Sequence, residues 1–194
     1  MNPYYIRDIW VRHFGDVPPL GFVLRDEFPD RWLRIHSLPA SQRYASNERE
    51  YGEILRRHNE VASHILSDGS ECGLIVSAPC EEPDLDRVRE YAPDLPVLNA
   101  IGQLPEHLWD DDDGIFACPM CLFGAEIEWS PSAYDGFIRA IADDRIEGLV
   151  FSFDTGRVYA PYDGGADLFF RDTNDRDDAK GRFRAWLSTH PAGL

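Results

Sequence analysis

Residues 148–170 read GLVFSFDTGRVYAPYDGGADLFF, and this stretch indicates how the chain folds. Its branched and aromatic residues predict two short strands, Gly148–Phe153 and Arg157–Tyr159, joined by a turn at Asp154-Thr155-Gly156. After the turn PYDGGAD, Leu168–Phe170 is predicted as a third strand. Strands that follow one another through short turns pair in an antiparallel way, so we expect an antiparallel C-terminal meander.

Apolar residues at steps of three and four predict helices on both sides of this meander. Asn47 followed by Glu50 is suited to capping the longest helix, and Ser130-Pro131 is a typical helix start. The predicted helices span residues 47–66, 131–142 and 175–187, and a short N-terminal helix ends near Gly15.

Branched and aromatic residues predict further strands at Gly21–Leu24, Trp32–Leu38, Cys72–Ala78 and Ile115–Trp129. Residues 81–113 are rich in Pro and Asp, and we expect a surface excursion with a short helix around Val88. No composition break resembles a linker. The sequence therefore predicts a single domain, residues 1–194, of the α/β (α+β) class. We expect a mixed sheet of about five or six strands, with the antiparallel meander, covered by helices.

The composition is strongly acidic, with 35 Asp and Glu against 19 Lys and Arg and a net charge of −16. This charge repels the phosphates of nucleic acids and anionic lipid surfaces, and it attracts a basic protein. We therefore expect no nucleic-acid or membrane partner. The longest apolar stretch, Ile115–Phe123, is about half of the roughly 20 residues that cross a bilayer. The N-terminal residues lack the pattern of a secretory signal, so we expect a cytoplasmic protein.

The cysteines are few for a domain built on disulfides, and we expect reduced thiols. They are Cys72, Cys80, Cys118 and Cys121. The CPMC segment at residues 118–121 has the spacing of a redox pair or of half a zinc site, but the chain offers no second close pair. We expect no metal and no cofactor, and we interpret the thiols as small buried apolar groups.

Candidate catalytic residues occur without a known catalytic signature. The chain lacks GxSxG, HExxH, GxxxxGK[ST] and a GxGxxG that follows a strand. His36 lies at the end of a predicted strand and is a candidate acid or base near neutral pH. His58 faces inward on the longest helix, and we interpret it as a core histidine.

The PYDGGAD turn is the most distinctive segment of the chain. Asp154, Asp163 and Asp167 would form a site for a cation or a basic group if the hairpin brings them together. Asp163 and Asp167 join His36 as the catalytic candidates. The predicted binding residues are Arg43, Tyr44, Asp154, Tyr162, Asp163 and Asp167. The alternative interpretation is a tight turn in which Asp163 bonds its own backbone.

Three separated motifs resemble a group of bacterial proteins of unknown function and of about this length. They are RWLRIHSLPASQRY at residues 31–44, VYAPYDGGADLFF at 158–170 and FRAWLSTHPAGL at 183–194. The resemblance covers most of the chain and implies a bacterial cytoplasmic protein. It brings no catalytic residues that could be carried over.

The acidic charge and the absence of a known catalytic motif together favour an acidic protein-interaction or inhibitor module. Its most concrete form is an immunity protein that binds a basic toxin. The alternative is a small hydrolase-like enzyme that uses His36 or the Asp154, Asp163 and Asp167 group. The sequence leaves the oligomeric state open.

Overall fold

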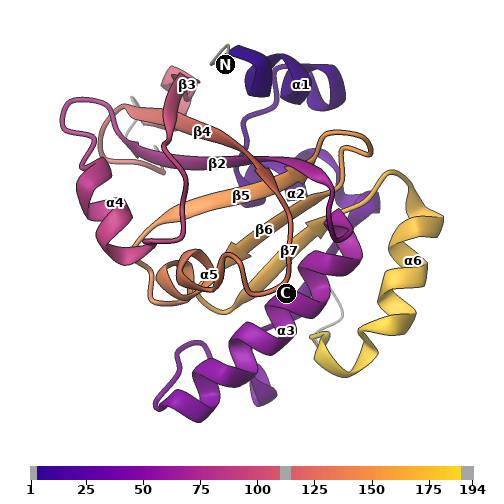
Figure 1. The fold of residues 1–194 in the computed structure, drawn as a ribbon. Helices are drawn as coiled ribbons and strands as arrows, with labels where there is room; N and C mark the ends of the chain where they lie inside the picture. Colours follow the sequence, from indigo (N-terminus) through magenta and orange to yellow (C-terminus); the bar gives the residue numbers. More distant parts are fainter. Residues whose placement is uncertain (1–3, 110–114, 189–194) are drawn as a thin grey trace.

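The computed structural model describes residues 4–109 and 115–188, which form one seven-stranded sheet covered by helices (Figure 1). The strand order is β1-β7-β6-β5-β2-β4-β3, and each neighbouring pair is antiparallel. The predicted α+β class of a single domain is confirmed. The sheet is antiparallel throughout instead of mixed. Two neighbouring parallel strands would need a crossover connection between them, and the described residues contain none. No described helix is long and apolar enough to cross a membrane.

The strands are β1 Trp32–His36, β2 Glu71–Pro79, β3 Asn99–Gln103, β4 Met120–Glu128, β5 Glu147–Ser152, β6 Val158–Tyr162 and β7 Gly165–Phe169. The α-helices are α1 Tyr4–Phe14, α2 Gly21–Glu27, α3 Glu48–Leu66, α4 Leu85–Tyr91, α5 Asp135–Ala142 and α6 Thr173–Arg182. Short 3-10 turns lie at η1 Pro29–Arg31, η2 Pro39–Ser41, η3 Glu106–Leu108 and η4 Arg184–Trp186.

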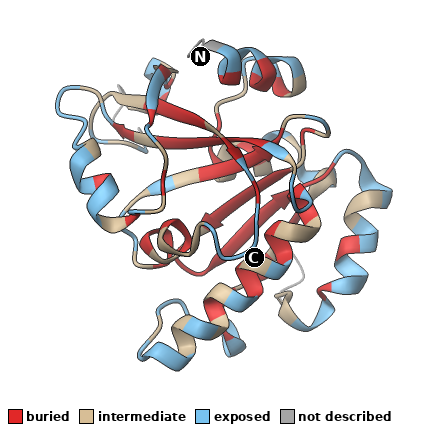
Figure 2. Ribbon diagram, viewed as in Figure 1, coloured by how far each residue is buried: buried red, intermediate tan, exposed pale blue. Residues whose placement is uncertain are grey.

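The sheet has two buried faces with separate cores (Figures 1 and 2). The larger core lies under α3, α5 and α6, and the smaller one under α1 and α2. Successive residues of a strand point to opposite faces, so Tyr159 packs in the larger core and Val158 in the smaller one. Neighbouring residues of one strand thus reach different environments.

Helix α3 shows how the local sequence sets an element. The side chain of Asn47 accepts hydrogen bonds from the amides of Arg49 and Glu50, which satisfies two free donors at the helix start. Ile54, Val61 and other residues at helical spacing are buried against the sheet. The predicted start and end at residues 47 and 66 are confirmed within one residue.

The C-terminal meander is confirmed, with longer strands and a tighter second turn than predicted. Tyr162 pairs with Gly165, so only Asp163 and Gly164 form the turn. Gly165 is required for space: a Cβ atom there would lie 1.9 Å from the carbonyl oxygen of Ile35. Gly165 therefore allows the close approach of β1 to β7, and neither Gly164 nor Gly165 has a left-handed φ.

Several segments differ from the predicted secondary structure. The predicted helices 131–142 and 175–187 are observed as α5 Asp135–Ala142 and α6 Thr173–Arg182, and the predicted strand Ile115–Trp129 as β4 Met120–Glu128. Residues Gly21–Leu24 belong to helix α2, where the amide of Leu24 donates to the carbonyl of Leu20. The apolar run there is too short for its periodicity to separate strand from helix. Strand β3 was not predicted, because NAIGQ is short, half-exposed and poor in branched residues. The short helix around Val88 is confirmed as α4.

The prediction of four reduced thiols is wrong in the structure, which contains a disulfide between Cys80 and Cys121. The pairing of Ala78 with Cys121 places Cys80 just past the end of β2, and the two Cα atoms lie 4.9 Å apart. Cys118 and Cys121 of the CPMC segment are therefore not partners. Cys72 and Cys118 are free, and Cys72 is buried.

Candidate functional site

A pocket of about 560 Å³ lies over the sheet on the face that α1 and α2 cover only in part. Strands β1, β7, β6, β5 and β2 form its floor, the segment 19–22 at the start of α2 forms one wall, and residues 144–148 form a rim. Its volume lies in the range of ordinary ligand pockets. Tyr162, Asp163 and Asp167, which were predicted as site residues, line it.

The strand register explains which side chains meet in this pocket. Arg34 is opposite Asp167, and Asp167 is opposite Ala160, so the three side chains share one face. On the far side of the floor Ser77 is opposite Glu147 in the same way. The pocket therefore collects polar residues from segments that are far apart in the sequence.

Asp167 is the centre of a paired charge cluster on the floor. Its carboxylate accepts two hydrogen bonds from Arg34, at 2.8 and 2.9 Å, and a third from the indole nitrogen of Trp32 at 2.8 Å. Burial opposes the charge of Arg34, but the hydrogen bonds and charge of Asp167 outweigh it and raise the pKa of the guanidinium. With three donors already bound, Asp167 is poorly placed to act as a base or a metal ligand.

Asp163 is occupied as well, by the two residues predicted to bind beside it. Its carboxylate accepts hydrogen bonds from Arg43 Nε at 2.5 Å and from the hydroxyl of Tyr44 at 2.8 Å. The Arg43 side chain is 65% exposed and that of Asp163 only 8%. Arg43 and Tyr44 therefore cover Asp163 at the surface, and the contact draws the loop after β1 to the turn between β6 and β7.

Tyr162 offers a free hydroxyl at the pocket. Its ring lies beneath the guanidinium of Arg34, whose central carbon is 4.7 Å from the ring centre. Burial raises the pKa of Tyr162 to about 12, so its hydroxyl stays protonated at neutral pH. Among the described residues none forms a hydrogen bond with this hydroxyl. Tyr162 can therefore donate a hydrogen bond to a ligand.

His36 and Asp154 do not line the pocket. The Nε2 atom of His36 is buried without a hydrogen-bond partner among the described residues. Burial, and then the charges of Arg34 and Arg57, lower the pKa of His36. Asp154 lies in the turn between β5 and β6, at the other end of β6 from Asp163. The Asp154, Asp163 and Asp167 group therefore does not converge.

Sequence reasoning missed the rim formed by Asp144, Arg145 and Glu147, all of which are exposed. Glu147 accepts a hydrogen bond from the hydroxyl of Ser77 at 3.2 Å. The Arg145 guanidinium instead lies over the ring of Tyr91 in α4, 5.6 Å from the ring centre. No pattern in the sequence marks the acidic residues after α5, and only the sheet pairing brings them to a pocket.

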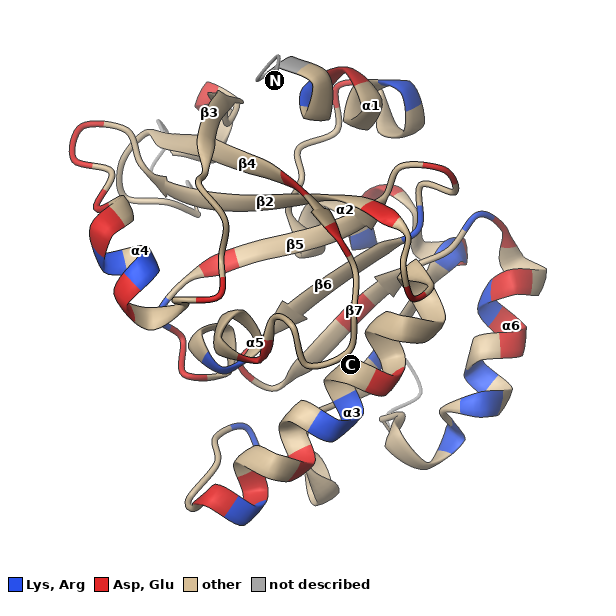
Figure 3. Ribbon diagram, in the orientation of Figure 1, with Lys and Arg blue, Asp and Glu red and all other residues tan. Residues whose placement is uncertain are grey.

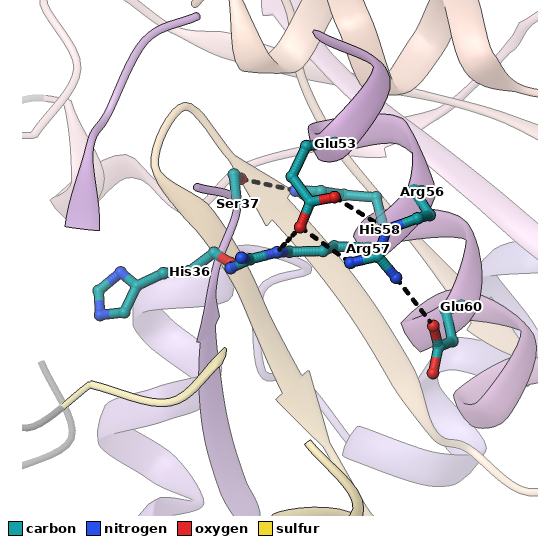
Figure 4. Close-up of polar contacts among 7 residues, drawn as sticks. All are labelled: His36, Ser37, Glu53, Arg56, Arg57, His58 and Glu60. Atoms are coloured by element: carbon teal, nitrogen blue, oxygen red, sulfur yellow. Dashed lines mark hydrogen bonds and ion pairs between the residues drawn. The ribbon is translucent and has the colours of Figure 1, made fainter. Parts of the chain in front are cut away.

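A second polar cluster, on the opposite face of the sheet, was also missed, and Figure 4 draws two of its members, Ser37 and His58. The hydroxyl of Ser37 lies 2.7 Å from Nε2 of His58, and Nδ1 of His58 lies 2.6 Å from the hydroxyl of Tyr159. All three residues are buried, and burial followed by the charge of Arg57 lowers the pKa of His58 to about 3. The interpretation of His58 as a core histidine is confirmed. This Ser-His pair is closed to substrate and holds α3 against the sheet.

Charged residues of α3 continue this contact toward His36 (Figure 4). Arg57 donates to the carboxylate of Glu53 at 2.6 Å and to the backbone carbonyl of His36 at 3.0 Å. Hydrogen bonds from Arg56, and then from Arg57, outweigh partial burial and lower the pKa of Glu53 to about 2. The imidazole of His36 itself points away from this network (Figure 4).

Comparison with known proteins identifies the family alone. No curated protein and no solved structure matches the chain. Residues 20–191 match the family model described as domain of unknown function DUF3885. This match spans most of the chain and contains the pocket floor, the rim and both polar clusters. The chain therefore belongs to the DUF3885 family.

Proposed function

We propose that this protein is a binding module that recognises a basic protein partner, in the manner of an inhibitor. An immunity protein that neutralises a basic toxin in the bacterial cytoplasm is the most concrete form of this function. The observation that carries the proposal is the distribution of charge around the pocket. Its buried charges are paired internally, and acidic side chains prevail at its exposed rim.

The interior of the pocket offers no net charge to a partner. Asp167 is bound by Arg34, and Asp163 is bound by Arg43. Both carboxylates are thus neutralised within the chain, and Arg34 is neutralised by the same contact. A ligand that depended on a free interior charge would find none.

The exposed acidic residues next to the pocket support recognition of a basic surface. The segment 81–90 carries five acidic residues and two arginines, and all seven are exposed. Arg145 on the rim lies over the ring of Tyr91, the last residue of α4, so α4 ends beside the rim. Figure 3 shows acidic residues on α4, on the loop that precedes it and on the loop before β5. Such a surface raises the association rate with a cationic protein, most strongly at low ionic strength.

The enzyme alternative is supported by one observation, the unpartnered Nε2 of His36. A general base needs a free acceptor atom within hydrogen-bond reach of its substrate. His36 has the free atom but does not line the pocket, and the carboxylates beside it are bound by arginines. Binding therefore has the stronger support.

The test is affinity capture with the full chain from its native cells, at low and at high salt. We expect a basic protein to be retained at low salt and released at high salt. Asp86→Lys/Glu90→Lys on α4 should abolish this capture. Asp177→Lys/Asp178→Lys carries the same charge change on α6, away from the pocket, and should retain it.

Equal loss of capture in the α4 and α6 variants would show that the net charge of the protein alone attracts the partner. That result would contradict a specific acidic binding surface beside the pocket. Retention of a small molecule without any protein, together with loss of that molecule in His36→Ala, would favour the enzyme.

A further inference from the structure

We propose that the pocket binds one arginine side chain of the basic partner, with its aliphatic stem on the pocket floor and its guanidinium at the acidic rim. This inference rests on the proposed function and names the chemical group that the site takes. The proposal is carried by an apolar floor that lies next to two carboxylates with free acceptor capacity, the exposed Asp144 and Glu147. Burial raises the pKa of the Glu147 carboxyl.

The floor suits the stem of a long cationic side chain. Ile75, Leu149 and Ala160 form its apolar part, and Phe22 and Met120 line its sides. Methylene groups of arginine cover apolar surface while the charged end stays near water. The volume of about 560 Å³ also leaves room for the backbone on either side of the inserted residue.

The rim offers the acceptors. Glu147 receives one hydrogen bond, from Ser77 at 3.2 Å, so most of its lone pairs are free. The Asp144 side chain is exposed and forms no hydrogen bond or ion pair with the described residues. Arg145 is turned toward Tyr91 and leaves both carboxylates unpaired. A planar guanidinium binds carboxylates with two parallel hydrogen bonds, which an ammonium cannot do.

The same residues argue against an anionic ligand. The pocket is lined by four carboxylates, Asp144, Glu147, Asp163 and Asp167, and by two guanidiniums, Arg34 and Arg145. Arg34 is already bound on two nitrogens by Asp167. The hydroxyl of Tyr162 donates to a backbone carbonyl of the inserted segment as readily as to any other acceptor. Charge and donor inventory together favour a cation.

The experiment measures the affinity of hexa-arginine and hexa-lysine peptides for the full chain by calorimetry at low salt. The variant Asp144→Asn/Glu147→Gln removes the rim charges and keeps the side-chain shapes, and asparagine tolerates the positive φ of residue 144. The variant Asp177→Asn/Asp178→Asn on α6 is the matched control, with the same charge change outside the pocket. We expect the rim variant to weaken hexa-arginine by about tenfold or more, and the control by about twofold.

A second readout locates the bound peptide. Amide signals of Gly148, Leu149 and Tyr162 should shift on titration with hexa-arginine, and they should stay in place in the rim variant. Hexa-lysine should bind more weakly than hexa-arginine, because it lacks the bidentate contact.

Each other outcome overturns a distinct claim. Equal weakening in the rim variant and the control rejects the pocket as the anchor and leaves the basic-partner function standing. Equal binding of the two peptides, lost only in the rim variant, rejects arginine as the preferred group. Absence of saturable binding by both peptides at low salt contradicts both the anchor and the proposed function.

Discussion

The two polar clusters lie on opposite faces of the sheet and differ in how they handle charge. Ser37, His58 and Tyr159 are shielded from water and form a neutral network. Arg34, Asp167 and Tyr162 line a pocket that is open to water, and a full ion pair is retained there. A charge without a partner is costly in the interior, so the dry cluster uses a neutral imidazole and the pocket uses matched charges. Burial therefore decides which chemistry each face keeps.

The largest effect is expected from removing one partner of the ion pair. Asp167→Ala leaves the guanidinium of Arg34 largely buried and unpaired, and it should lower the free energy of unfolding by about 3–5 kcal/mol. Urea denaturation measures the change. Asp163→Ala is the matched control, because Arg43 is exposed and returns to water. A loss of the same size in both variants would show that burial of the arginine does not matter.

Reduction of the disulfide comes next and acts near the pocket. Cys80 and Cys121 join the ends of β2 and β4 beside Pro79 and Met120, which line the pocket. Opening this link should lower the free energy of unfolding by about 2–4 kcal/mol, measured in urea with and without reductant. The Cys80→Ser variant should match the reduced protein and be insensitive to reductant. Alkylation of the protein as it is taken from cells should find two free thiols, Cys72 and Cys118, and four free thiols would contradict the disulfide.

In the buried cluster of Ser37, His58 and Tyr159, protonation of His58 should lower the free energy of unfolding at acid pH. Its pKa is about 3 in the folded chain, against 6.5 when unfolded, so protonation favours the unfolded state. The stability contribution is complete above pH 6.5 and falls below it by about 1.4 kcal/mol per pH unit, or about 2 kcal/mol by pH 5. Urea denaturation from pH 7 to pH 5 measures this slope. His58→Gln should flatten it, and an unchanged slope would assign the acid response to His36, His64 or the carboxylates.

The smallest effect comes from a matched pair of tyrosines on the two faces. Tyr159→Phe removes the hydroxyl that bonds His58 and leaves a buried nitrogen without its partner. It should lower the free energy of unfolding by about 1–2 kcal/mol. Tyr162→Phe removes a hydroxyl that no described residue binds, and should change stability by less than about 0.5 kcal/mol. Equal losses in thermal or urea denaturation would remove the distinction between the faces.

Sequence reasoning predicted those features that depend on neighbours along the chain. Asn47 and the apolar residues behind it specify α3 through capping and helical spacing, and both act within a few residues. The turn at Asp154 lies between strands β5 and β6 for the same reason. The same reasoning failed at Gly21–Leu24, where four apolar residues carry no clear period, and at β3, whose pairing with β4 is stronger than its own preference.

The candidate site was predicted only in part. Tyr162, Asp163 and Asp167, which the sequence singled out as candidate site residues because glycine and aspartate around a tight turn are distinctive, line the pocket. The sequence could not tell that each aspartate is bound by an arginine. Glu147 was missed, since a single acidic residue before a strand resembles any surface position.

By itself the sequence determined the acidic charge, the longest helix, the C-terminal meander and the inward position of His58. Only the tertiary structure decided which side chains meet. Arg34 and Asp167 are 133 residues apart, His58 and Tyr159 are 101 apart, and Cys80 and Cys121 are 41 apart. Such contacts depend on strand order and register, and a shift by one residue would turn every side chain of a strand to the other face. Local patterns specify the elements, and the packing of the sheet specifies the site.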